Sequence, residues 1–84
     1  MPVIARFFGI IIKMFFINGE HQPPHVHVVY GEYNATFDIQ TGEMLEGDLS
    51  PRAKALVQEW IGLHSEELLE MWNTQQFKTL PPLK

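Results

Sequence analysis

The chain has 84 residues, a formal net charge of −4 and no cysteine. This length allows one domain over residues 1–84 with a modest core, because so short a chain buries only about 60–65% of its unfolded surface. The absence of cysteine excludes disulfides, thiolate metal sites and a cysteine nucleophile. The Lys and Arg residues are scattered, so general nucleic-acid binding, which needs a concentrated basic patch, is disfavoured.

The apolar run 3–17 is predicted to form strands and not a membrane segment. It is interrupted by Arg6 and Lys13, and it is shorter than the stretch of about 20 apolar residues that a spanning helix needs. No small-residue cleavage site follows it, which argues against a signal peptide. Its β-branched and aromatic residues, divided by Gly9, predict strands over 3–8 and 10–17. We therefore expect no membrane association and a cytoplasmic location.

The next two strands are predicted as a tight hairpin. Pro23 and Pro24 cannot donate to a sheet ladder, so the first strand should begin at His25 and run to residue 30. Gly31-Glu32 then indicates a type II′ turn before a strand over 33–39. In this register the residue numbers of each cross-strand pair sum to 63. A one-residue slip would mix the apolar and polar faces. One face pairs Tyr30 with Tyr33, Val28 with Ala35 and Val26 with Phe37, and the other pairs Val29 with Asn34, His27 with Thr36 and His25 with Asp38.

The sheet should end with a turn at 40–42 and a short strand at 43–46, because Gly42 suits a left-handed turn position. Ser50 is suited to a helix N-cap and Pro51 to the first helical position. These signals place the sheet in residues 3–46 and the start of a helix immediately after it.

Apolar residues at three- and four-residue intervals predict an amphipathic helix over 50–73, with Trp60 and Trp72 as core anchors. Gly62 weakens the pattern, so we expect the helix to be kinked or split near Gly62 to Ser65. The segment 74–84 is predicted to be a frayed tail. The expected fold class is α+β: an antiparallel sheet of four to five strands followed by a C-terminal helix.

Two histidines at alternate positions of the predicted strand, His25 and His27, are the sharpest functional signal. Alternation directs both side chains to one face, about 6.5–7 Å apart at Cα, so both imidazoles can reach one metal ion. His21 could fold back onto them through the proline-containing loop, and Asp38 lies opposite His25 in the predicted register. The candidate metal ligands are therefore His21, His25, His27 and Asp38, and zinc is a candidate divalent cofactor.

The same residues allow two other interpretations. His25 or His27 could act as a general acid or base, oriented by Asp38 without a metal. Alternatively, the histidines belong to the polar face of a hairpin and have a structural or partner-contact role. These alternatives leave open whether the chain is an enzyme.

A partner surface is predicted from the aromatic content. The segment 3–17 contains more phenylalanine than so small a core needs, and an exposed apolar patch marks a partner surface. The phenylalanines are Phe7, Phe8, Phe15 and Phe16. We therefore expect a homodimer or a complex with another small protein.

Several segments carry a resemblance to a known family: residues 1–10, the box His21-Gln22-Pro23-Pro24-His25-Val26-His27, Tyr30, the turn region between Gly42 and Gly47, Glu59-Trp60, His64 and Glu67-Leu68. Together they resemble the small proteins grouped as domain of unknown function 4160. In that family the histidine box usually reads His-Asn-Pro-Pro-His-Phe-His, so Gln22 and Val26 differ here while the histidines are retained. The resemblance covers roughly residues 1–73.

The resemblance implies a cytoplasmic bacterial or archaeal protein whose gene often neighbours another small gene, an arrangement typical of toxin–antitoxin pairs. It implies no established activity. The leading hypothesis is a small partner-binding protein, a component of a toxin–antitoxin-like pair. The alternative is a metal-dependent or histidine-based hydrolase or nuclease that uses His21, His25 and His27.

Overall fold

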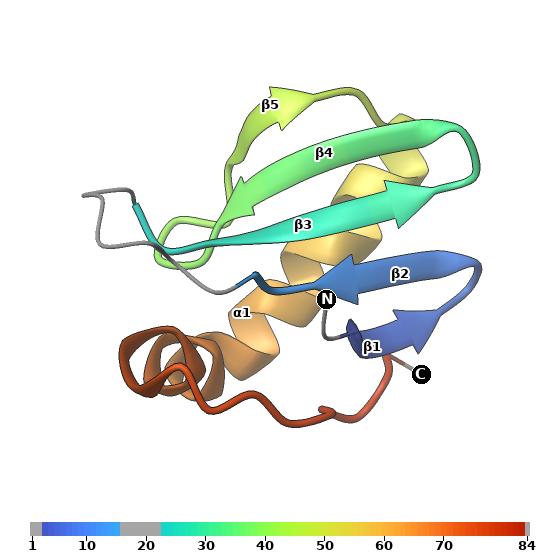
Figure 1. Ribbon diagram of the computed structural model, residues 1–84. Coiled ribbons are helices and arrows are strands. Elements are labelled where there is room, and N and C mark those ends of the chain that lie inside the picture. Colours follow the sequence, from blue (N-terminus) through green and yellow to red (C-terminus); the bar gives the residue numbers. More distant parts are fainter. Residues whose placement is uncertain (1–2, 16–22, 84) are drawn as a thin grey trace.

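The computed structural model describes residues 3–15 and 23–83 and has two layers, a sheet and a helix (Figure 1). The fold is α+β, as predicted, and the helix crosses behind the sheet in the view of Figure 1. Each strand pairs with the next along the chain, so the sheet is an antiparallel meander in the order β1-β2-β3-β4-β5. The elements are β1 (Val3–Phe7), β2 (Ile10–Lys13), β3 (His25–Tyr30), β4 (Tyr33–Asp38), β5 (Met44–Gly47) and α1 (Pro51–Thr74).

The hairpin of β3 and β4 has the predicted register along its whole length. Its pairs run from His25 opposite Asp38 to Tyr30 opposite Tyr33. Gly31 has φ +60°, the positive φ that the first turn position of a type II′ hairpin requires. Because the register is correct, the predicted sorting of side chains between the two faces of this hairpin is also correct.

The hairpin of β1 and β2 turns at Phe8 and Gly9, which both have positive φ (50° and 80°). Two consecutive positive φ values are typical of a type I′ turn, whose twist matches that of the flanking strands. Phe8 is 57% exposed, so it lies outside the core to which Ile4, Phe7, Ile10 and Ile12 of this hairpin belong. The predicted strand over 10–17 is shorter than expected: β2 ends at Lys13, and residues 16–17 lie outside the described part of the chain.

The core lies between one face of the sheet and α1. Alternate residues of the strands are buried because successive side chains point to opposite faces of a sheet. The helix contributes Trp60, which is fully buried and packs its ring 5.9 Å from that of Phe7. Among the fully buried side chains of this core are Ile4, Ile12, Val26, Val28, Phe37, Val57, Trp60 and Leu68.

The helix begins as predicted, with the side-chain oxygen of Ser50 accepting a hydrogen bond from the backbone N–H of Ala53 (3.2 Å). The predicted kink is confirmed at His64, whose φ and ψ of −121° and 16° are not helical. The Nδ1 of His64 lies 3.1 Å from Oε1 of Glu67, and this contact bridges the kink. Among the described residues, no helix combines the length and apolarity that a membrane crossing requires.

The prediction that the C-terminal tail frays is wrong. The tail returns along the outer edge of the sheet, where the backbone N–H of Leu80 donates to the carbonyl oxygen of Ile4 (2.7 Å). The indole Nε1–H of Trp60 donates to the carbonyl oxygen of Pro81 (2.9 Å). Leu80 and Leu83 are buried, so the tail contributes apolar area to the core and pairs with the exposed edge of β1.

Candidate functional site

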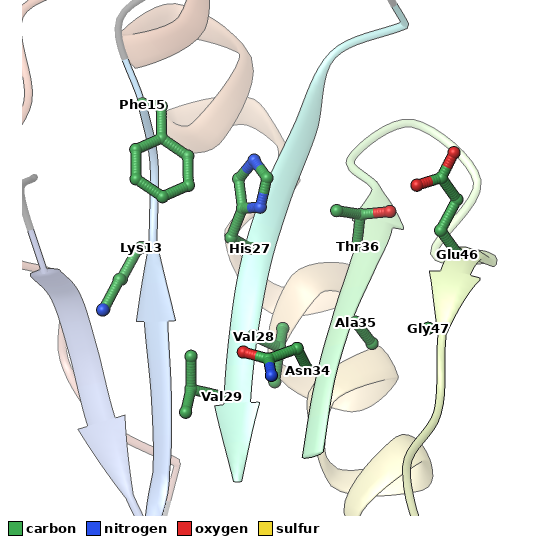
Figure 2. Close-up of a pocket in the computed structure, with 10 residues that line it drawn as sticks. All are labelled: Lys13, Phe15, His27, Val28, Val29, Asn34, Ala35, Thr36, Glu46 and Gly47. Carbon is green, nitrogen blue, oxygen red and sulfur yellow. The ribbon is translucent and has the colours of Figure 1, made fainter. Parts of the chain in front are cut away.

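The helix covers one face of the sheet, and the histidines project from the other. On this second face the side chains are half-buried or exposed, whereas their neighbours along β2 and the middle of β3 and β4 point into the core. Figure 2 shows this face, with the helix behind the strands. We call it the open face, and its residues include Arg6, Ile11, Lys13, His25, His27, Val29, Asn34, Thr36, Asp38 and Glu46.

Four polar residues of the open face form a line across four neighbouring strands. Lys13 on β2 is opposite His27 on β3, His27 is opposite Thr36 on β4, and Thr36 is opposite Glu46 on β5. We call these four residues the polar row (Figure 2). A cationic side chain therefore stands at one end of the row and a carboxylate at the other.

The polar row lies in two adjoining hollows of the open face. The first has a volume of about 420 Å³ and contains the whole row together with Phe15. The second, of about 520 Å³, shares His27, Thr36 and Glu46 and adds residues on the side of His25, including Leu45. Because both hollows are shallow and open to solvent, they suit a partner surface or an extended ligand better than an enclosed small molecule.

The two histidine rings lie side by side, as the strand geometry predicts. Their centroids are 5.1 Å apart, with 66° between the ring planes. The carbonyl oxygen of Pro23 accepts a hydrogen bond from Nδ1 of His25 (2.8 Å), which assigns the proton of the neutral ring to Nδ1. Nε2 of His25 is then the nitrogen with a free lone pair. This is the form in which an imidazole accepts a proton or ligates a metal ion.

The surroundings of His27 favour its neutral form. Its ring lies edge-on to that of Phe15, with 4.1 Å between centroids. Partial burial lowers the pKa of His27 below its ordinary value, and the positive charges of His25 and Lys13 lower the pKa further. His27 is therefore a neutral imidazole at pH 7, available as a base or as a ligand.

Asp38 lies opposite His25, as predicted, but its carboxylate is engaged in the next turn. Oδ1 of Asp38 accepts hydrogen bonds from the backbone N–H groups of Gln40 (2.7 Å) and Thr41 (3.0 Å). This arrangement caps the connection between β4 and β5. Within the described ranges, no group of three His, Asp or Glu side chains is placed to hold a metal ion. His21 lies outside those ranges, so the predicted site of His21, His25, His27 and Asp38 stays a prediction.

Sequence reasoning did not bring Glu46 or Trp72 to this region, and it did not show that Lys13 lies on the strand beside His27. Lys13 and Glu46 join the histidines only through the order of strands in the sheet, which the sequence left open. Trp72, predicted as a core anchor, also packs against His25, with 5.0 Å between ring centroids. The register of β3 and β4 was the signal that placed Thr36 beside His27.

Comparison with protein families gives a match to the domain of unknown function DUF4160 over residues 9–73. The chain belongs to this family. The matched region includes the whole polar row and His25, together with α1 as far as residue 73, so these features lie within the family's domain. The resemblance noted from the sequence is thereby confirmed. Comparison with curated proteins and with solved structures gave no match.

Proposed function

We propose that the chain is a small cytoplasmic protein-binding module that engages its partner through the open face of the sheet. The observation that carries the proposal is the polar row, a line of side chains with opposite charges at its ends, set in the hollows of a face that α1 does not cover. Charges arranged in this way select a partner with the complementary pattern and fix its orientation.

Apolar side chains beside the polar row supply area for such a complex. Ile11, Phe15 and Val29 are only half-buried, and Leu45 on β5 is 43% exposed. Interfaces commonly combine apolar and aromatic contacts with a polar rim. A module that binds a small protein encoded beside it, as in a toxin–antitoxin-like pair, would use this combination.

Two substitutions of the same kind test the proposal. Val29→Glu places a charge among the apolar residues of the open face, whereas Leu63→Glu places one on α1, where Leu63 is 66% exposed. The measurement is complex formation, by light scattering of the pure chain and by co-purification with the co-expressed product of the adjacent gene. We expect Val29→Glu to abolish the complex and Leu63→Glu to retain it.

Circular dichroism of each variant shows whether the fold is kept. A wild-type chain that forms no complex in either experiment would refute the proposal. So would a folded Val29→Glu variant that binds as well as the wild type.

A histidine-based hydrolase or nuclease is the second candidate function. It is favoured by the adjacent rings of His25 and His27 and by the neutral state of His27 at pH 7. One imidazole could remove a proton from the attacking group while the other protonates the leaving group, and Lys13 could bind an anionic phosphate.

RNA cleavage by the tag-free wild type, by His25→Ala and by His27→Gln tests this second function. Elemental analysis of the same tag-free wild-type sample shows whether a metal is bound. Activity that both substitutions abolish would support the acid–base function. Equal cleavage by all three proteins would show that a contaminating nuclease is responsible.

A further inference from the structure

The charges of the polar row are arranged antisymmetrically about its centre. Lys13 and Glu46 occupy the outer strands of the row, and His27 and Thr36 occupy the inner ones. Neighbouring strands are about 4.8 Å apart, so each charged end lies about 7 Å from the midpoint between β3 and β4. The row is therefore positive on one side of this midpoint and negative on the other.

Neither end of the row is neutralised within the described part of the chain. The ion pairs there are formed by Glu67, with His64 at 3.1 Å and with Lys78 at 3.8 Å, on the helical side of the molecule. Lys13 and Glu46 thus present a cation and an anion on the same face, and neither forms an ion pair with another described residue. A partner that supplies one charge of each sign at the same separation would neutralise both.

A second copy of the chain supplies these charges in the required order. A two-fold interface brings the same patch of both copies together, so the patch must complement itself. An axis in the interface plane, parallel to the strands and passing between β3 and β4, exchanges the two ends of the row. Lys13 then faces the partner's Glu46, and Glu46 faces the partner's Lys13. An axis along the row would instead place like charges opposite each other.

We therefore propose that the open face binds a second copy of this chain about a two-fold axis parallel to the strands, with two Lys13–Glu46 contacts between the copies. This inference rests on the proposed function and names its partner. Facing sheets pack about 10 Å apart with their strands crossing at about −30°. Lysine and glutamate are long side chains, so they can span this separation at the ends of the row.

The size of the face predicts a weak dimer. Strands of six residues and a sheet of five strands give a flat footprint of about 20 Å by 20 Å, or about 400 Å² per copy. Two copies would together bury about 800 Å², which is below the range of about 1,200–2,000 Å² for stable specific interfaces and in the class of weak, transient encounters. We therefore expect a dissociation constant in the micromolar range, so that dilution produces monomers.

Charge reversal tests the proposal by analytical ultracentrifugation over a range of concentrations. Lys13→Glu alone, or Glu46→Lys alone, places like charges opposite each other at both contacts, and we expect each to weaken the dimer at least tenfold. The double variant Lys13→Glu/Glu46→Lys restores both contacts with the signs exchanged, and we expect its dissociation constant to return to within about threefold of the wild-type value. Lys54→Glu and Glu59→Lys on α1 are matched controls that should leave dimerisation unchanged.

Neutral variants cover the case in which a charge reversal disturbs folding. Lys13→Gln and Glu46→Gln should each weaken the dimer by a smaller factor, and added salt should weaken the wild type more than either of them. A double variant that dimerises no better than the single reversals would overturn the proposal. Single reversals that dimerise as well as the wild type would overturn it too.

A wild-type chain that stays monomeric at all concentrations also overturns the second copy as the partner. The proposed function is then decided separately, by the co-expression experiment with Val29→Glu. If the adjacent gene's product binds the wild type and not that variant, the open face is a binding surface for a different protein.

Discussion

The imidazole of His25 packs against the indole of Trp72, with 5.0 Å between their ring centroids. Trp72 belongs to the last turns of α1, beyond the kink at His64, and it is 7% exposed. The same imidazole lies 5.1 Å from that of His27. The end of the helix therefore supports the histidine pair from the side of the core. This contact couples the stability of the helix end to the geometry of the open face.

Replacement of Trp72 by alanine should destabilise the protein and release the ring of His25. We expect a loss of about 3 kcal/mol in the free energy of unfolding, because truncation of a large buried aromatic side chain leaves a cavity. Urea unfolding measures the loss. NMR of the histidine ring protons measures the release, since the indole ring current no longer acts on His25. Trp72→Phe retains an aromatic neighbour and should change both quantities less. Unaltered His25 resonances in Trp72→Ala would contradict the contact.

Gly47 ends β5 at a position where a side chain does not fit. Its φ is +96°, and a Cβ atom there would lie 2.6 Å from the Cα of Ala35 and closer still to the backbone oxygen of Asn34. Gly31 also has positive φ, but a Cβ there would meet open space. Alanine substitutions at the two glycines therefore distinguish the cost of backbone strain alone from the cost of strain together with a steric collision.

Gly31→Ala should lower the free energy of unfolding by about 1–2 kcal/mol, the penalty for a left-handed alanine. Gly47→Ala should cost about 1–3 kcal/mol more, because it adds overpacking against β4. Urea unfolding of both variants measures the difference. Equal losses in the two variants would show that β4 and β5 do not approach as closely as described.

The pairing of β3 with β4 could be predicted because a two-residue turn leaves few registers and only one sorts apolar from polar side chains. The same register correctly placed Asp38 opposite His25. Register does not predict how the carboxylate is used, since the backbone N–H groups of the following turn compete for its oxygens. That competition depends on the local turn geometry.

The polar row was beyond sequence reasoning because it depends on neighbours that are distant along the chain. Lys13 meets His27 only if β2 pairs with β3, and an antiparallel meander is one of several orders that five strands allow. Glu46 meets Thr36 next to a register irregularity between Thr36 and Phe37. Bulges of this kind cannot be derived from alternation, because an extra residue reverses the faces.

The tail shows a different failure of pattern reasoning. Proline-rich termini without periodicity are usually frayed, and the tail has neither helical nor strand period. Its order comes from two apolar side chains that reach the core and from single hydrogen bonds to Ile4 and Trp60. Such contacts have no signature in the local sequence.

Leu80→Ala should therefore destabilise the protein although it lies outside every helix and strand. Leu80 is 3% exposed, and loss of a buried leucine side chain costs about 2–3 kcal/mol at a site that can partly collapse. Leu63→Ala is the matched control, because Leu63 is 66% exposed and its loss should change stability by less than about 0.5 kcal/mol. The urea midpoints of the two variants show whether the side chain of Leu80 stabilises the fold. Equal midpoints would mean that the tail contributes nothing to the core in solution.

Protonation of His27 should destabilise the folded chain. Its pKa is lowered on folding by burial, then by the positive charges of His25 and Lys13. Between this lowered pKa and the ordinary value near 6.5, the unfolded chain binds more protons than the folded one. The contribution of His27 to stability is therefore complete above pH 6.5. It falls as the pH drops through this window and becomes constant below the folded pKa.

Urea unfolding at a series of pH values from 7.5 to 5 measures this effect, with His27→Gln as the control. Glutamine does not titrate, while His25, Lys13 and the nearby Glu46 remain in both proteins, so the difference between the two curves isolates His27. We expect the wild type to lose more stability than His27→Gln as the pH falls. Parallel curves would show that His27 has the same pKa in the folded and unfolded chains, which would contradict the lowering of its pKa by burial and by the neighbouring charges.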